Sequence, residues 1–128
     1  MGFKPRTRLA ILALALALGA TACVSGGGGG SARPAGSSSS RIVEEELVTL
    51  HQLSALEAVR RLRPRWLQSR TGAPPQVHVD GNPIGNVENL NAVRVADIQD
   101  MRFLNAADAT TRFGTNYISG VILITTKR

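Results

Sequence analysis

The stretch GVILITT, residues 120–126, determines what kind of fold this 128-residue chain can adopt. Its residues are apolar or β-branched and do not alternate with polar ones, which predicts a strand buried on both faces. Gly120 permits a sharp entry into that strand. We therefore expect the C-terminal end of the chain to lie inside a sheet.

Two elements are predicted directly before this strand. Met101 and Phe103 alternate with Arg102, which indicates a strand over residues 100–104. A short helix is expected over residues 106–113, because Gly114 stands where a glycine ends a helix.

A hairpin is predicted further upstream, around Asp80-Gly81. Residues 77–79 alternate as a half-buried strand does, which places His78 on the solvent face rather than in a catalytic role. Only a short edge strand can follow at Pro83-Ile84, because proline lacks the backbone donor of a ladder. Brief helical turns are expected over residues 87–93 and 95–98.

The folded part is predicted to open with two helices. The first includes Val43, Leu47 and Leu50, which are spaced as on one helical face. Ser54 begins the second with a capping box to Glu57, and Pro64 ends it. An apolar stripe runs along the second helix: Ala55, Val59, Leu62 and Trp66. The fold class is therefore α+β, a mixed sheet of short strands with short helices in the order α-α-β-β-α-β-α-β.

Four arginines gather at the end of the second helix: Arg60, Arg61, Arg63 and Arg65. One interpretation is contact with an anionic ligand, a lipid headgroup, nucleic acid or another partner. The plainer interpretation, which we favour, is a solvated face with cations near a helix C-terminus. The net charge of +6 supports nucleic-acid binding little, because three positive charges lie in the first 22 residues and leave +3 for the remainder.

Residues 1–22 are laid out as a secretory signal peptide. Basic residues come first, an apolar run follows over residues 9–20, and the small residues Ala20-Thr21-Ala22 end the segment. The apolar run is shorter than the roughly 20 residues that span a bilayer. We therefore expect export from a bacterial cytoplasm.

Cys23 follows these small residues directly, which resembles the lipobox of bacterial lipoproteins. That resemblance implies cleavage before Cys23 and acylation of this residue. It also implies the outer membrane, because Val24 rather than Asp comes next. The alternative is an ordinary A-x-A cleavage site that releases the domain into the periplasm or medium.

The segment 24–40 consists mostly of glycine, serine and other small residues, which predicts a flexible linker after Cys23. Such a chain reaches about 20–25 Å, enough to hold a domain away from a bilayer. A tether of this kind favours lipidation over plain secretion, and it sets the folded domain at residues 41–128.

No catalytic or metal-binding constellation is evident. The single cysteine excludes an internal disulfide and a thiolate zinc site, and His51 and His78 lack the spacing of metal ligands. The linker glycines are not a P-loop, because no G-K-[ST] follows. We expect a protein that is not an enzyme and needs no cofactor.

Several motifs resemble the plug domain of TonB-dependent outer-membrane receptors. Residues 120–127 are similar to its closing strand G-V-I-x-I-x-T-K, and Val79-Asp80-Gly81 to its V-D-G turn. Residues 97–114 resemble its D-I-x-x-I-x-V-L-x-G-x-x-A-x-x-x-Y-G segment, with Ala106 in place of a glycine. The likeness begins near residue 42, with opening helices at 45–47 and 58–64 similar to those of the family.

The resemblance implies a plug-like domain without the barrel that encloses such plugs, because the chain ends at Arg128. Together with the anchor it implies an envelope lipoprotein that acts as a binding or docking module, linked to an outer-membrane receptor or a TonB-system protein. The alternatives are a structural protein that associates with itself and a secreted domain with another ligand.

Overall fold

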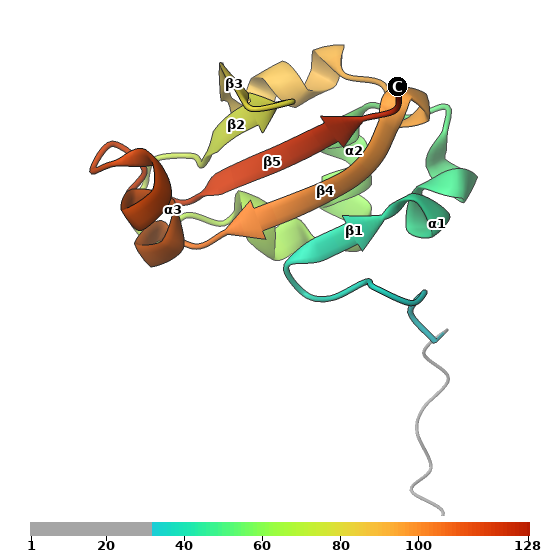
Figure 1. The fold of residues 1–128 in the computed structure, drawn as a ribbon, viewed down its shortest axis with the longest axis horizontal. Coiled ribbons are helices and arrows are strands. Elements are labelled where there is room, and N and C mark those ends of the chain that lie inside the picture. Colours follow the sequence, from blue (N-terminus) through green and yellow to red (C-terminus); the bar gives the residue numbers. More distant parts are fainter. Residues whose placement is uncertain (1–31) are drawn as a thin grey trace, which may run out of the picture. The chain divides into compact units, whose positions relative to one another are not determined.

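In the computed structural model, which describes residues 32–128, five strands form one mixed sheet in the order β1-β4-β5-β2-β3 (Figure 1). The strands are β1 (Arg41–Val43), β2 (Gln76–Val79), β3 (Asn82–Asn86), β4 (Ile98–Leu104) and β5 (Val121–Thr126). β5 lies at the centre, antiparallel to β4 and parallel to β2. The predicted α+β class, with a mixed sheet and short helices, is confirmed.

Short helices connect the strands. The α-helices are α1 (Glu44–Leu47), α2 (Ala55–Leu62) and α3 (Ala106–Phe113). The 3-10 helices are η1 (Val48–Leu50), η2 (Pro64–Leu67), η3 (Val87–Ala92) and η4 (Val95–Asp97). None of the helices in the described part of the chain is long and apolar enough to cross a membrane.

The local signals of α2 produce the expected helix. The Ser54 side chain accepts from the backbone N–H of Glu57, and the Glu57 side chain accepts from the backbone N–H of Ser54. This confirms the capping box, and the helix ends at Leu62, ahead of Pro64, as predicted. Ala55, Val59 and Trp66 of the predicted stripe are buried and Leu62 packs against them.

The main core lies between one face of the sheet and the layer formed by α1, α2 and the 3-10 helices. Fully buried side chains from four strands meet this layer: Ile42, Val77, Met101 and Ile122. The ring of Trp66 stacks on Phe103 of β4, with ring centroids 5.9 Å apart. Apolar burial of this kind is the dominant stabilising term of a small domain.

One strand was missed by the sequence analysis. Residues 41–43 form β1, which pairs antiparallel with β4 through Ile42 and Met101, so the prediction that Val43 is helical is wrong. A three-residue strand is too short for periodicity to show, and its pairing partner lies about 60 residues further along the chain.

β5 has the predicted bounds, but the prediction that both its faces are buried is only half right. Val121, Ile122 and Ile124 are buried, whereas Leu123 is half-buried and Thr125 is exposed. The sheet therefore has one face covered along its length and a second face that is covered only where β5 begins.

The hairpin turn at Asp80-Gly81 also forms where it was expected. Both residues have positive φ, 49° and 85°. The Asp80 carboxylate accepts from the backbone N–H and the hydroxyl of Thr126, at 2.9 and 2.6 Å, and these bonds lower the pKa of Asp80. β3 forms the sheet edge, as Pro83 predicted, although it runs over five residues.

The flexible linker predicted over residues 24–40 needs correction in its C-terminal part. Residues 32–40 belong to the same compact unit as the domain, and the Ser39 carbonyl accepts from the indole Nε1 of Trp66 at 2.8 Å. A polar composition carries no sign of such contacts, because the partners lie far along the chain. Cys23 and the signal segment lie outside the described residues.

Candidate functional site

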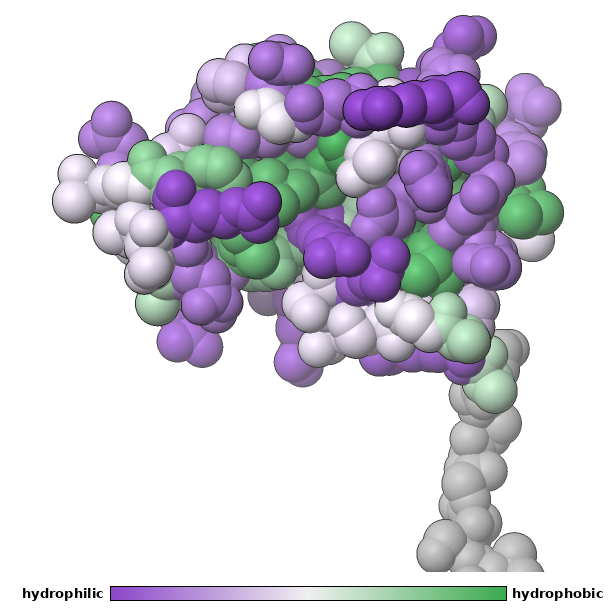
Figure 2. All heavy atoms as spheres, in the orientation of Figure 1, coloured by the Kyte–Doolittle hydropathy of each residue, from purple (hydrophilic) through white to green (hydrophobic). Residues whose placement is uncertain are grey.

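The second face of the sheet is covered by α3 only where β5 begins, and the fold leaves the rest of it open. Because side chains alternate along a strand, the residues between the core positions point to this face. The strand registers align them in rows across the sheet, one of which is Arg41, Arg102, Leu123 and His78. Figure 2 looks on to this face and shows a strip of apolar atoms between hydrophilic side chains.

A charged cluster on β1 and β4 joins this row to the next one, which holds Asp100. The carboxylate of Asp100 accepts from Nε of Arg41 and from Nε of Arg102, each at 3.2 Å. Two arginines thus share one carboxylate, which leaves one positive charge unneutralised. Val43 and Thr125 flank Asp100 in the register, so apolar and hydroxyl groups stand beside the charges.

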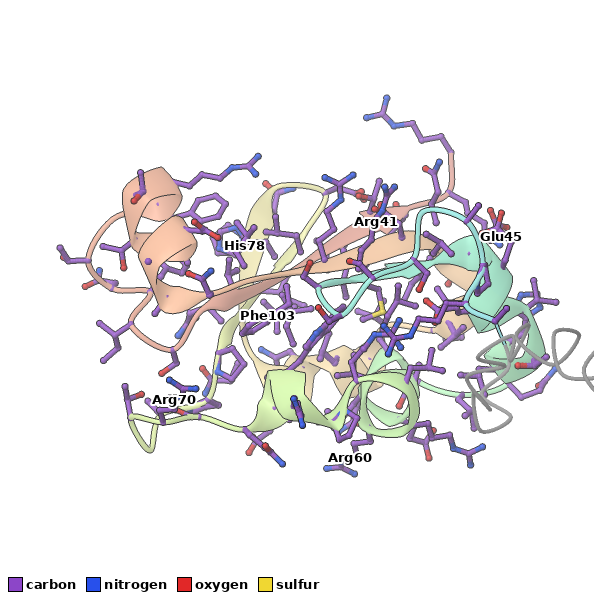
Figure 3. All side chains as sticks on the ribbon, turned by 90° about the horizontal axis from the view of Figure 1, so that it is seen from below. Arg41, Glu45, Arg60, Arg70, His78 and Phe103 are labelled. Carbon is purple, nitrogen blue, oxygen red and sulfur yellow. The ribbon has the colours of Figure 1, made fainter. Side chains whose placement is uncertain are left out.

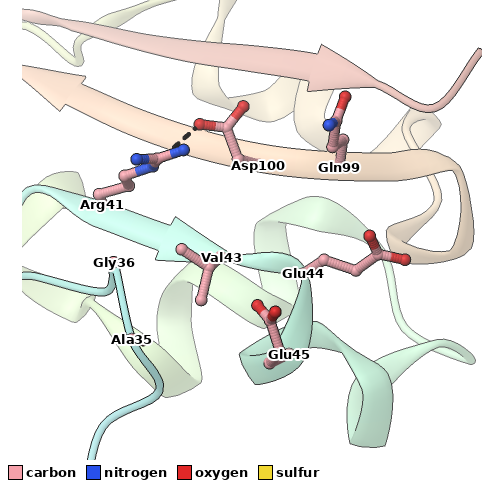
Figure 4. A pocket seen from close by; sticks show the side chains of 8 residues that line it. All are labelled: Ala35, Gly36, Arg41, Val43, Glu44, Glu45, Gln99 and Asp100. Atoms are coloured by element: carbon pink, nitrogen blue, oxygen red, sulfur yellow. Dashed lines mark hydrogen bonds and ion pairs between the residues drawn. The ribbon is translucent and has the colours of Figure 1, made fainter.

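A hollow of about 310 Å³ opens next to this cluster at the β1 edge (Figure 4). Its polar lining comes from five side chains: Arg41, Glu44, Glu45, Gln99 and Asp100. Glu44 also bonds the ammonium of Lys127 at 2.7 Å. The hollow therefore extends the open face with groups that suit polar contacts to a partner surface.

At the other end of this face, α3 and the loop after it cover His78. The imidazole is only 3% exposed and packs against the rings of Phe113 and Tyr117, with centroids 4.7 and 5.5 Å away. The prediction of a solvent-facing His78 is therefore wrong. The alternation of residues 77–79 correctly placed His78 on the face opposite the core. It could not show that α3 folds back over that face, which is visible in Figure 3.

The imidazole of His78 makes one hydrogen bond, between Nε2 and the Tyr117 hydroxyl at 3.0 Å. Its Nδ1 is buried without a partner, and burial lowers the pKa of His78. A neutral ring in an aromatic cluster explains this environment. No nucleophile or carboxylate is bonded to the imidazole in the described part of the chain.

Comparison of the chain with protein-family models, curated proteins and solved structures finds no match. The function must therefore be inferred from the chain's own residues. That the chain is a plug-like domain therefore stays a hypothesis, which rests on the sequence motifs alone.

The structure separates the four arginines that the sequence placed together. Arg63 is 8% exposed and forms an ion pair with Glu46, with Nη2 and Oε1 2.9 Å apart. Its Nε donates to the Ser38 carbonyl at 3.0 Å, and its Nη1 donates to the Leu62 carbonyl at 2.8 Å. This guanidinium is occupied by the protein itself and is not available to a ligand.

Glu46 shows how firmly this pair is held. Burial raises the pKa of its carboxyl, but hydrogen bonds from Ser37 and Arg63 and the positive charge of Arg63 outweigh that effect, so the pKa is lowered overall. The pair also fixes the segment before β1, since Arg63 Nη2 donates to the Ser37 hydroxyl oxygen at 3.0 Å. Sequence analysis missed Glu46, because its partner lies 17 residues away.

The other three arginines are exposed. Arg60 and Arg61 lie on α2, and Figure 3 shows Arg60 on the far side of the helices from the open face. Arg65 of η2 lines a separate hollow together with Arg70. Of the four arginines predicted to contact an anion or partner, Arg60 and Arg61 are therefore solvated and only Arg65 lines this hollow.

Metal chemistry finds no support within residues 32–128. That part of the chain contains no group of three or more His, Cys, Asp or Glu residues that could hold a metal ion.

Proposed function

We propose that this protein is a non-enzymatic docking module of the bacterial envelope, held at the outer membrane by a lipid on Cys23. The open face of the sheet is the surface through which it binds a partner protein of that membrane. The observation that carries the proposal is this face itself: β1, β4 and β5 present Arg41, Arg102 and Leu123 without a covering helix.

The chemistry of the face favours a partner with carboxylates beside an apolar side chain. The arginine pair shares a single Asp100, so an acidic partner gains from the unneutralised charge. Leu123, which is half-buried, offers apolar contact next to these charges, as in the centre of a protein interface.

The same charges disfavour a second copy of the chain as the partner. Two copies that met through the part of this face that carries Arg41 and Arg102 would oppose the arginines of both molecules, and like charges opposed across an interface cost free energy. A structural role through self-association is the alternative outcome of the test.

Site-specific photocrosslinking in the living bacterium tests the proposal. A photoreactive residue at Thr125 reports on the open face, and one at Arg61 reports on the helical side. We expect an adduct with an outer-membrane protein from position 125 but not from position 61. The substitution Arg102→Glu should remove the adduct.

The matched control is Arg94→Glu. Arg94 is also exposed and also forms an ion pair, with Asp97 at 3.4 Å, but it lies in the loop before η4. This control should keep the adduct. An adduct of twice the monomer mass would favour self-association, and no adduct at position 125 would refute docking through this face.

A further inference from the structure

A second hollow, of about 420 Å³, lies between the loop after η2 and the loop that joins α3 to β5. One wall comes from residues 65 and 68–71, and the other from residues 105–107, 118 and 119. Phe103 of β4 also lines it. This site is distinct from the open face, because its aromatic side chain belongs to the helical side of the sheet (Figure 3).

The hollow is positively charged. Arg65 and Arg70 both line it, and no residue of its lining is acidic. Neither guanidinium takes part in any ion pair within residues 32–128. Both side chains are exposed, so they can turn toward a ligand without breaking a bond of the fold.

Three hydroxyls stand beside the arginines and join the two walls. Thr71 Oγ1 lies 2.6 Å from Ser119 Oγ and 3.0 Å from Ser69 Oγ, and the two serine oxygens are 3.4 Å apart. Each hydroxyl has one proton that rotates to suit its neighbours. Two of these protons are enough to bond Ser69, Thr71 and Ser119 to one another, so the third can turn toward an anion while the walls stay joined.

The apolar part of the hollow completes its chemistry. Ile118 is 57% exposed and is one of two large apolar side chains exposed in residues 32–128. Together with Phe103 it places hydrocarbon beside the two cations. A ligand that suits both parts carries an anionic group and an apolar chain.

We propose that this hollow binds the phosphate group of an anionic lipid. The planar guanidinium forks bind phosphate oxygens with paired hydrogen bonds. Donors from the hydroxyl cluster supplement them, and Ile118 contacts the first methylenes of an acyl chain. The proposal rests on the envelope location in the proposed function only for access to lipid. The site itself depends on other residues than the docking face.

Titration of the mature protein in a neutral detergent with dihexanoyl phosphatidic acid tests the site. Trp66 is the only tryptophan and stacks on Phe103, so its fluorescence reports on the hollow. The double variant Arg65→Gln/Arg70→Gln should bind at least about tenfold more weakly, since each hydrogen bond to a charged group contributes on the order of that factor. Dihexanoyl phosphatidylcholine should bind weakly to both proteins.

The matched control is Arg60→Gln/Arg61→Gln, which removes the same charge from exposed positions outside the hollow. Its affinity should stay within about twofold of the wild type. Ser119→Ala keeps both arginines and should weaken binding by about fivefold, through the loss of one neutral donor. Circular dichroism checks that each variant is folded.

Three results would overturn the proposal. An equal loss of affinity in the two double variants would mean that net charge, and not the hollow, binds the lipid. Equal affinity for inorganic phosphate would remove the lipid from the assignment. If the phosphatidic acid does not change the Trp66 fluorescence of the wild type, the hollow is not a binding site. None of these three results affects the crosslink expected at position 125.

Discussion

At the scale of single residues, Arg63 turns a positive run of sequence into part of the fold. Its guanidinium joins α2, the segment before β1 and Glu46 of α1. Both side chains of the ion pair are at least nine-tenths buried. Breaking such a pair is strongly destabilising, because the remaining charge stays buried without compensation.

We therefore expect Arg63→Gln to lower the free energy of unfolding by about 3 kcal/mol. Urea unfolding of the mature protein, followed by Trp66 fluorescence, measures the change. Arg61→Gln is the control and should stay within about 0.5 kcal/mol of the wild type, since Arg61 is exposed. A loss below about 1 kcal/mol in Arg63→Gln would contradict a buried pair.

His78 gives a prediction about pH. Burial lowers its pKa in the folded state, so the unfolded chain binds a proton at a higher pH than the folded chain does. Stability is then fully present above about pH 6.5, the ordinary pKa of histidine, and falls as the pH decreases below that value. Unfolding free energies at pH 7.5 and 5.5 should show this loss, and His78→Phe should reduce it.

The control for this experiment is His51→Gln, because His51 is exposed. It should leave the pH dependence unchanged. The pH range stops at 5.5 because Glu46 also changes the unfolding free energy in more acidic solution. Its lowered pKa gives stability above the ordinary value of about 4.3, which is lost as the pH falls further. If the unfolding free energy falls equally between pH 7.5 and 5.5 in the wild type and in His78→Phe, His78 is not the cause of the loss.

At the scale of the elements, Gly120 fixes how β5 enters the sheet beside β4. Its φ is +86°, and a Cβ at this position would lie 2.5 Å from the Leu104 carbonyl oxygen and 2.9 Å from the Phe103 ring. Backbone cannot yield at so short a distance without disturbing the β4–β5 ladder. The glycine that the sequence marked as a sharp entry is thus required by both conformation and space.

We expect Gly120→Ala to destabilise the protein by about 3 kcal/mol or more, through the strained φ and the clash together. Gly114→Ala isolates the conformational part. Its φ is +103°, but an added Cβ meets nothing within 4 Å, so a loss of about 1–2 kcal/mol is expected. Thermal unfolding compares the two, and similar losses would refute the clash.

The elements also show what a sequence can predict. β5, α3 and the capping box of α2 were found because their signals lie within a few neighbouring residues. β1, the burial of His78 and the Arg63–Glu46 pair were not, because each depends on residues from distant parts of the chain. Of the four candidate arginines, Arg65 alone lines the hollow of about 420 Å³, which their proximity in the sequence could not indicate.

At the scale of the whole molecule, the lipid anchor that we propose on Cys23 would decide which partners the open face and the hollow beside Arg65 can meet. The predicted linker is shorter than its sequence indicated, since residues 32–40 belong to the folded unit. The domain is then expected to work close to the membrane surface, where lipid phosphates and outer-membrane proteins are both within range.

This geometry depends on acylation of Cys23, which the intact mass of the membrane-extracted protein tests. We expect cleavage before Cys23 together with the added mass of two or three acyl chains, because one chain alone gives only marginal anchoring. Cys23→Ala should lack that mass and leave the membrane fraction. An unacylated wild-type chain that begins at or near Cys23 would instead release the domain. The crosslink to a membrane partner should then disappear, while binding of the short-chain phosphatidic acid in solution should persist, since the hollow is built entirely from residues 65–119.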